Sequence, residues 1–243
     1  MDRARAIIVF AFAALSGKAA QEALLLPGSD RAGYLARLLI NESAFPGERG
    51  YVSEEDTKTA MRALLLTVDA RICQVPSGYT REEVADTASG DLIDVITAGG
   101  RGGQMEGFYR DRNGAPSMAP RVTRRIDNLQ RIAGQGDPDR FARLLTYAQT
   151  LATAYLAGNK PSPDLYAQIT RIAPKNVTGR AYGWMTDQDY YHPGGAFVRI
   201  PDRLRGRLGG NRFYTLERRG RAALESAKSA ASRPLVTVPT SRK

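Results

Sequence analysis

The 243-residue chain has very few of the side chains that most often carry metal or thiol chemistry. It contains one cysteine, one histidine and one tryptophan. A single cysteine excludes a disulfide framework and a cysteine-rich zinc site. A single histidine excludes a multi-histidine metal site, and any serine or cysteine triad would have to use His192. The sequence shows no zinc motif, phosphate loop or dinucleotide fingerprint, so we predict no metal ion and no small-molecule cofactor.

Acidic residues are scarce at the C-terminal end. Residues 199–243 contain twelve Lys and Arg against three Asp and Glu, whereas residues 1–198 contain twenty-three against twenty-two. From residue 218 onward the chain is rich in Ala, Ser and Arg and poor in large apolar residues, a composition typical of disorder. We interpret residues 218–243 as a basic tail. Such a tail favours an anionic partner, such as an anionic wall polymer, a membrane surface or nucleic acid.

The N-terminal apolar run is too short for a membrane span. Arg3 and Arg5 precede the apolar residues 6–15, and small residues follow them. This is the layout of a secretory signal peptide, whereas a span needs about 20 apolar residues. We therefore predict a signal peptide over residues 1–19 and one exported domain over residues 28–217, located in the periplasm or cell wall. A buried first helix of the mature domain and a signal-anchor are the alternatives.

Apolar spacing and capping residues predict a mainly helical chain. One helix should start at Ser29 or Asp30 and end before Phe45, and another should start after Ser53. A Thr80–Glu83 capping box starts a third, with a break near residues 89–90. Further helices are expected over residues 122–132 and from 138 to a stop at residue 158. Residues 99–120 are expected to form a glycine-rich loop, residues 212–217 a short strand, and Cys73 a buried position.

Glu42 carries the most chemical content of any residue in the sequence. Helical spacing places it on the same face as an apolar stripe formed by Leu35, Leu38 and Leu39. A carboxyl group at the end of a buried stripe has a raised pKa because burial disfavours its charged form. A carboxylic acid that stays protonated near neutral pH can donate its proton to the leaving oxygen in glycoside cleavage. The alternative is a helix-end carboxylate that faces solvent or pairs with Arg37 or Arg49.

Three sequence blocks carry a resemblance to a known family. Residues 35–50 read LARLLINESAFPGERG, Ile93-Asp94-Val95-Ile96 is followed by Gly103-Gln104-Met105, and residues 210–214 read GNRFY. The apolar helix expected over residues 60–72 lies between the first two blocks. Together the blocks resemble the cell wall hydrolase family typified by the spore-cortex lytic enzyme of germination. The resemblance covers residues 34–217.

The resemblance implies a lysozyme-like, mainly α fold with a short β element near the C-terminal end. It also implies cleavage of the peptidoglycan glycan strand between N-acetylmuramic acid and N-acetylglucosamine, with Glu42 as the general acid and Gln104 in the substrate groove. A lytic transglycosylase, in which one Glu serves as acid and then as base, is slightly favoured over a hydrolase. A hydrolase would need a second carboxylate, for which the candidates are Glu48, Asp94, Glu106, Asp187 and Asp189.

Aromatic residues gather in the C-terminal part of the expected domain. Tyr182, Trp184 and Tyr214, together with Tyr190 and Tyr191, could pack against sugar rings as substrate-binding residues, or form a small aromatic core. A phage-encoded lysis enzyme is a variant of the same hypothesis. The competing hypothesis is a non-enzymatic envelope or phage assembly protein that binds an anionic polymer or nucleic acid through its basic end.

Overall fold

The computed structural model describes residues 24–135, 139–162, 165, 175–186, 194–201 and 209–220. The predicted signal peptide, and the predicted basic tail beyond residue 220, lie outside these residues. The fold is mixed, with 46% helix, 12% strand and two small sheets. Within the described residues, no helix is both long enough and apolar enough to cross a membrane.

The two helices that build the core begin where the sequence predicts. Helix α1 (Arg31–Asn41) starts after Asp30, whose carboxylate accepts hydrogen bonds from the backbone N–H groups of Ala32 and Gly33. Helix α2 (Glu54–Cys73) starts after Ser53, whose hydroxyl accepts from the Asp56 backbone. These caps satisfy donors that have no partner inside the helix. Both helices are buried along much of their length.

Two short helices follow α2. Helix α3 (Arg81–Ala85) has the predicted capping box between Thr80 and Glu83. The predicted break is confirmed, because a separate helix α4 (Leu92–Thr97) begins after Asp91. A single 3-10 turn, η1 (Gly100–Gly102), comes next.

The prediction of an irregular loop over residues 99–120 is wrong. The segment contains an antiparallel hairpin of β1 (Phe108–Arg110) and β2 (Pro116–Met118). Its turn is closed by Asp111, whose carboxylate accepts from the Asn113 and Ala115 backbones at 2.8 and 2.9 Å. Phe108 is fully buried and packs edge-on against Tyr34 of α1, with ring centroids 5.4 Å apart. Burial of this side chain attaches the hairpin to the core.

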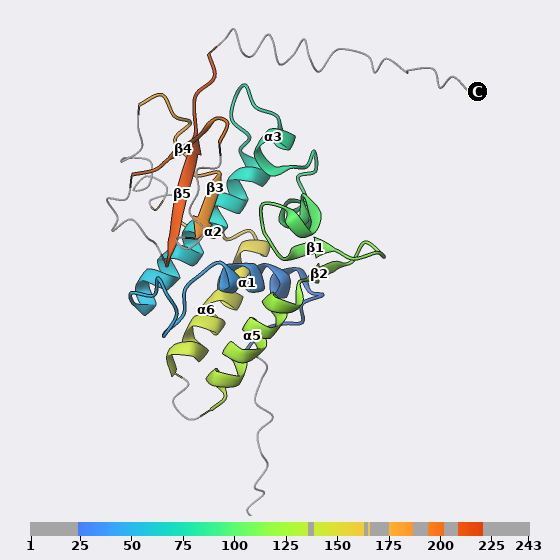
Figure 1. Cartoon of the computed structure of the whole chain (residues 1–243), viewed down its shortest axis with the longest axis vertical. Coiled ribbons are helices and arrows are strands. Elements are labelled where there is room, and N and C mark those ends of the chain that lie inside the picture. The colour runs from blue at the N-terminus through green and yellow to red at the C-terminus, as the bar shows by residue number, and fades with distance from the viewer. Residues whose placement is uncertain are drawn as a thin grey trace, which may run out of the picture.

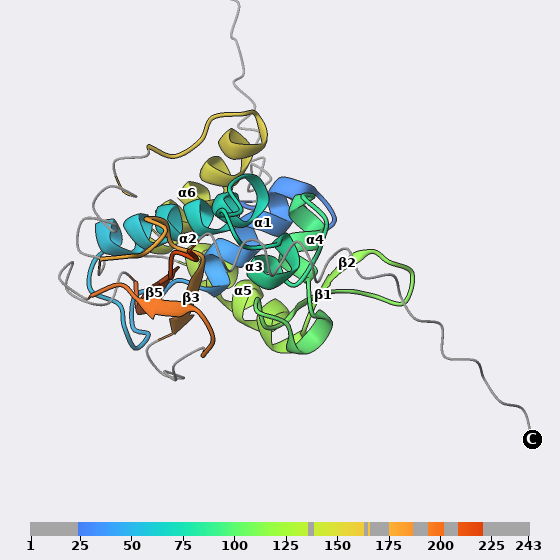
Figure 2. The same ribbon diagram turned by 90° about the horizontal axis from the view of Figure 1, so that it is seen from above.

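Helices α5 (Pro120–Ala133) and α6 (Asp139–Leu156) pack against α1 and against each other (Figure 1). The other layer is a three-stranded antiparallel sheet with β5 (Asn211–Leu216) between β3 (Gly183–Thr186) and β4 (Phe197–Arg199). The sheet lies on the α2 side of the molecule, apart from the β1–β2 hairpin (Figure 2). β5 confirms the strand predicted over residues 212–217 to within a residue.

The prediction that Cys73 is buried is wrong, because its side chain is exposed. It is the last residue of α2, where the chain leaves the core. At this end of the helix the Cys73 side chain faces solvent rather than the core.

Candidate functional site

Glu42 lies at the junction of α1, the sheet and the loop that follows α1. It is the C-cap residue of α1, and its N–H donates to the Leu38 carbonyl at 3.0 Å. Its own carbonyl accepts a hydrogen bond from the Asn211 side chain of β5. The backbone of Glu42 is therefore fixed from both the helix and the sheet.

The Glu42 carboxylate is held by two neutral donors. Trp184 of β3 donates from its indole Nε1 to Oε2 at 2.9 Å, and Asn41 donates from Nδ2 to Oε1 at 2.9 Å. Each carboxylate oxygen thus has one donor with no positive charge. Within the described residues, these two neutral donors rather than an ion pair fix the orientation of the carboxylate.

Burial raises the pKa of the Glu42 carboxyl above its usual value near 4.5. The hydrogen bonds from Trp184 and Asn41 and the charge of Arg125 act in the opposite direction, while the charge of Glu106 adds to the rise. The last carbonyls of α1 also carry a partial negative charge at this end of the helix, which further disfavours a carboxylate. The site therefore favours a protonated acid more than open water does.

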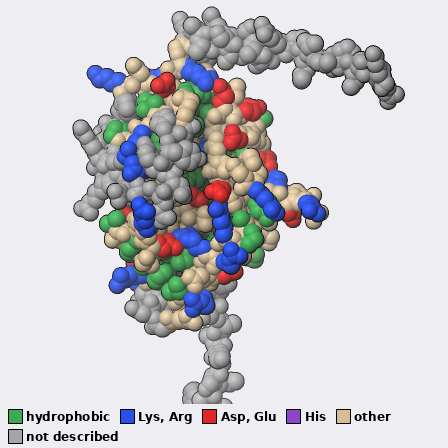
Figure 3. Space-filling model, in the orientation of Figure 1, with side chains coloured by type: hydrophobic (Ala, Val, Ile, Leu, Met, Phe, Trp, Pro, Cys, Tyr) green, Lys and Arg blue, Asp and Glu red, His purple; other side chains and the backbone are tan. Residues whose placement is uncertain are grey.

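Two adjoining cavities meet at Glu42. One has a volume of about 810 Å³ and the other about 400 Å³, and both are lined by Asn41, Glu42, Arg125 and Thr186. On the face shown in Figure 3, acidic and basic side chains lie next to one another near the middle of the molecule. The volumes fall in the range of ligand sites in proteins. Glu42 is half-buried, and it contributes to the lining of both cavities.

Arg125 of α5 organises the end of α1. Its guanidinium donates to the carbonyls of Ile40 and Ser43 at 2.8 and 2.9 Å, and it forms a two-point ion pair with Glu48. Glu48 also accepts from the Phe45 backbone at 2.8 Å. Arg125, which lines both cavities, is therefore engaged mainly by Glu48 and by carbonyls at the end of α1.

Glycines allow the loop after α1 to approach the turn before β5. A Cβ atom on Gly50 would lie 2.8 Å from the Gly210 Cα, a distance that side chains do not tolerate. Both glycines have positive φ angles, +90° and +82°. The backbones can therefore meet beside the smaller cavity, which both residues line.

The structure brings some of the predicted substrate-binding residues to this site and not others. Gln104 and Trp184 line the larger cavity with Glu42. Tyr182 and Tyr214 are almost completely buried and line neither cavity. Tyr182 donates from its hydroxyl to the Gln74 carbonyl, and burial raises its pKa to about 12. Tyr190, Tyr191 and His192 lie outside the described residues.

The candidates for a second carboxylate lie in different places relative to the two cavities. Glu106 lines the larger cavity and is ion-paired with Arg121 at 2.5 Å. Glu48 lines the smaller cavity but is bound to Arg125. Asp94 lies apart from both cavities, and hydrogen bonds from Ser89 and Arg110 lower its pKa. Asp187 and Asp189 are outside the described residues.

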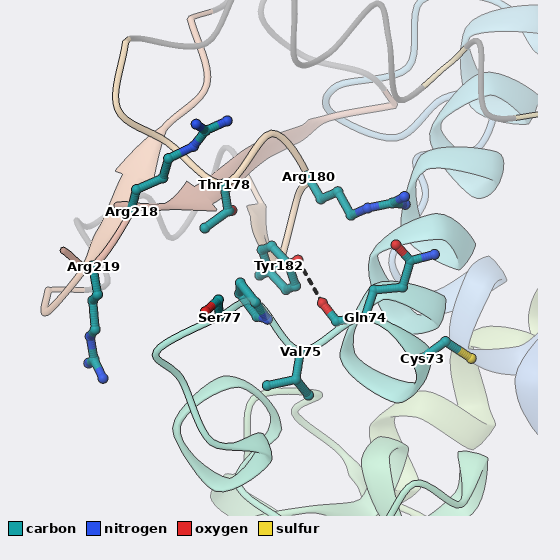
Figure 4. Close-up of a pocket in the computed structure, with 10 residues that line it drawn as sticks. Cys73, Gln74, Val75, Ser77, Thr178, Arg180, Tyr182, Arg218 and Arg219 are labelled. Atoms are coloured by element: carbon teal, nitrogen blue, oxygen red, sulfur yellow. Dashed lines mark hydrogen bonds between the residues drawn. The ribbon is translucent and has the colours of Figure 1, made fainter. Parts of the chain in front are cut away.

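A third cavity, of about 560 Å³, lies between the end of α2 and the sheet (Figure 4). Three arginines line it, but their side chains point in different directions. Arg218 donates to the Val177 carbonyl, and Arg219 donates to the Gly78 carbonyl and to Glu83. The guanidinium groups therefore do not converge on a common point inside this cavity.

Three residues that shape the site were not singled out in the sequence: Asn41, Arg125 and Asn211. Asn41 is the immediate neighbour of Glu42, and Asn211 belongs to the GNRFY block, so both had a local signal. Arg125 lies 82 to 85 positions from its carbonyl partners in and after α1. Nothing in the local pattern of α5 indicates that contact.

The described residues contain no group of three or more His, Cys, Asp or Glu side chains that could hold a metal ion. Compared with protein-family models, with curated proteins and with solved structures, the chain gives no significant match.

Proposed function

We propose that the protein is an exported peptidoglycan-cleaving enzyme that cuts the glycan strand with Glu42 as its general acid. The observation that carries the proposal is a partly enclosed carboxyl group held by neutral donors between two cavities. A group of this kind can deliver a proton to a glycosidic oxygen. The proposed lysozyme-like arrangement rests on the same site and on the sequence blocks around Glu42, Gln104 and residues 210–214.

The two cavities favour a polymer over a small molecule. Because both include Glu42, a chain that occupied them would pass the acid in its middle, so that sugar units would lie on either side of the scissile bond. Trp184 and Gln104 supply an indole and an amide on the larger side. Such groups match the apolar faces and the hydroxyls of sugar rings.

Lytic transglycosylase chemistry remains the preferred mechanism. Glu42 would protonate the leaving oxygen and then accept the proton of the muramic acid 6-hydroxyl as that hydroxyl attacks the anomeric carbon, so the acid is restored at the end of the reaction. Glu48 is a poor second carboxylate because Arg125 binds both of its oxygens. Glu106 is the described candidate that a hydrolase would use.

The test is digestion of purified peptidoglycan sacculi with mass analysis of the soluble products. We expect anhydro-muropeptides, whereas reducing ends would replace the transglycosylase by a hydrolase. Glu42→Gln should lower release about 10²–10⁴-fold, the usual contribution of a general acid. Glu55→Gln, at an exposed carboxylate paired with Arg62, is the matched control and should cleave like the wild type.

Two results would reject the proposal: no release by the wild-type protein, or unchanged release by Glu42→Gln. Glu106→Gln separates the two mechanisms. A transglycosylase should retain most of its rate in this variant, whereas a hydrolase that uses Glu106 to activate water should lose it.

A further inference from the structure

The Trp184 indole, which donates to Glu42, rests on a buried cation. Arg71 of α2 is 4% exposed, and its guanidinium carbon lies 5.3 Å from the centre of the Trp184 ring. This distance is within the range of a cation–π interaction. The guanidinium is planar and stays charged when it is buried, so it offers the ring a flat, positively charged surface.

The same side chain also holds the strand that carries Trp184. Arg71 donates from Nε to the Tyr182 carbonyl at 2.7 Å, two residues before Trp184 on the way into β3. Between them, Gly183 has no side chain, and a Cβ atom there would lie 3.7 Å from an Arg71 terminal nitrogen and 3.2 Å from the Phe197 ring. Arg71 therefore contacts both the backbone and the ring that deliver the indole N–H.

We propose that Arg71 is the positioning residue of this site, which fixes the Trp184 indole so that its Nε1–H stays directed at Glu42 Oε2. Within the described residues, the hydrogen bonds to the Glu42 carboxylate come from Trp184 and Asn41, not from Arg71. It acts through Trp184 and determines how firmly one carboxylate oxygen is held. Its relevance to catalysis rests on the proposed function, but the contact chain itself can be tested without substrate.

The consequence is a change in the protonation of Glu42. A donor held on Oε2 favours the carboxylate, so loss of its alignment should raise the pH at which Glu42 loses its proton. The other charged groups around the site stay in place in every variant below. Among the described residues they are Arg125 from α5, Glu48 and Arg49 from the loop after α1, and the residues Asp86, Glu106 and Arg121 that line the larger cavity.

The single tryptophan makes the test direct, because its emission reports on Trp184 alone. We would follow emission and the ¹³C signal of the Glu42 carboxyl against pH in the full-length protein without peptidoglycan. Glu42→Gln should abolish both transitions and so assign them. In Arg71→Met the midpoint should rise by about one pH unit, the equivalent of one hydrogen bond to a charged group.

A double-mutant cycle then separates positioning from general stability. Trp184→Phe should raise the carboxyl midpoint by a similar amount, and adding Arg71→Met to it should give no further shift. Arg81→Met is the matched control, because Arg81 also donates to a carbonyl near the end of α2, that of Ile72, and to the Ala88 carbonyl, rather than to the strand that carries Trp184. It should leave the midpoint unchanged. Arg71→Lys, which keeps the charge, should move the midpoint in the same direction by less.

The proposal is overturned if Arg71→Met and Arg71→Lys keep the wild-type midpoint while Trp184→Phe shifts it, or if the Arg71 and Trp184 shifts simply add. If Arg71→Met does not fold, Arg71→Lys alone decides. A shift in these titrations without any cleavage of sacculi would reject the proposed function but leave the positioning role intact.

Discussion

The C-terminal ends of α1 and α2 each enclose a carboxylate, and the two are held by opposite kinds of partner. Glu42 at the end of α1 accepts hydrogen bonds from an indole and an amide. Asp69, in the last turns of α2, is ion-paired with Lys160 at 2.8 Å and accepts from the Tyr155 hydroxyl at 3.1 Å. Its side chain is 4% exposed, so the cation beside it is required to balance a buried charge.

The difference shows how one fold surrounds two carboxyl groups with partners of different charge. The ion pair of Asp69 with Lys160 and its hydrogen bond from Tyr155 tie α6 and the segment after it to α2. At the end of α1 the cation is present too, but Arg125 is directed to Glu48 and to backbone carbonyls. Glu42 is left with neutral donors, and its proton is held more strongly than in water.

The strongest test of this contrast removes the cation at each end. Arg125→Met should lower the free energy of unfolding by about 2–4 kcal/mol, because it leaves Glu48 and several carbonyls without their donor. Lys160→Met is the matched change at α2, and its loss should be smaller because Asp69 keeps the Tyr155 hydroxyl as a donor, whereas Arg125 serves two carbonyls as well as Glu48. Chemical denaturation measures both. Equal losses would contradict the view that Arg125 organises the end of α1.

Asp69→Asn should be the next largest effect, and it should act on stability alone. We expect the free energy of unfolding to fall by about 1–3 kcal/mol, since the amide cannot balance the Lys160 charge. The rate of glycan release per folded molecule should stay at the wild-type level, as judged by active-site-normalised digestion of sacculi. A loss of rate comparable to that of Glu42→Gln would place Asp69 in the catalytic machinery instead.

The same comparison predicts that Glu42→Gln stabilises the protein at neutral pH. The pKa of Glu42 is raised in the folded state, so the wild-type protein is stabilised by its proton at low pH and loses that contribution as the pH rises through the folded pKa. The variant, which has no such group, should gain stability relative to the wild type on the order of 1 kcal/mol at pH 7, a common size for single substitutions. The gain should vanish below the ordinary carboxyl pKa near 4.5.

Thermal unfolding of both proteins at pH 4 and pH 7 measures this difference. Glu48→Gln is the contrasting variant, and it should be less stable than the wild type at pH 7, because the amide cannot form the ion pair with Arg125. A Glu42→Gln variant that is less stable than the wild type at pH 7 would show that the folded protein does not disfavour the Glu42 carboxylate at that pH.

Local signals in the sequence located the helices and singled out Glu42 as the candidate acid. Asp30, Ser53 and Thr80 each cap a helix through a contact within three residues, so their effect is visible in the sequence. Glu42 could be selected because helical spacing places it beside a buried stripe. The hairpin was missed, although the Asp111 turn had a local signal, because the glycines that flank it resemble an irregular loop.

The surroundings of Glu42 could not be predicted in the same way, because they come from distant parts of the chain. Trp184 is 142 positions away and Asn211 is 169 positions away. Which face of β3 and β5 meets the end of α1 depends on strand register and on close backbone approaches such as Gly50 to Gly210. For the same reason Tyr182 and Trp184, two residues apart, were grouped together, yet one is a core residue and the other reaches the acid.

The smallest expected effect is the change in the free energy of unfolding when the basic C-terminal end is shortened. Arg218 and Arg219 hold the Val177 and Gly78 carbonyls, and the Arg219 guanidinium lies 3.9 Å from the centre of the Tyr79 ring. Removal of residues 221–243 should therefore change the free energy of unfolding by less than about 0.5 kcal/mol and leave glycan release intact. Removal from residue 218 onward should cost more, since it takes these contacts away from the α2 side.

Salt dependence distinguishes this expectation from the binding hypothesis. If the basic end serves mainly to grip nucleic acid, the chain shortened after residue 220 should lose most of a binding affinity that falls steeply with salt. If the body around Glu42 carries the function, the shortened chain should still release glycan at the full rate and differ only in how strongly it adheres to an anionic wall. Loss of cleavage in the shortened chain, with its fold intact, would move the function from the end of α1 to the tail.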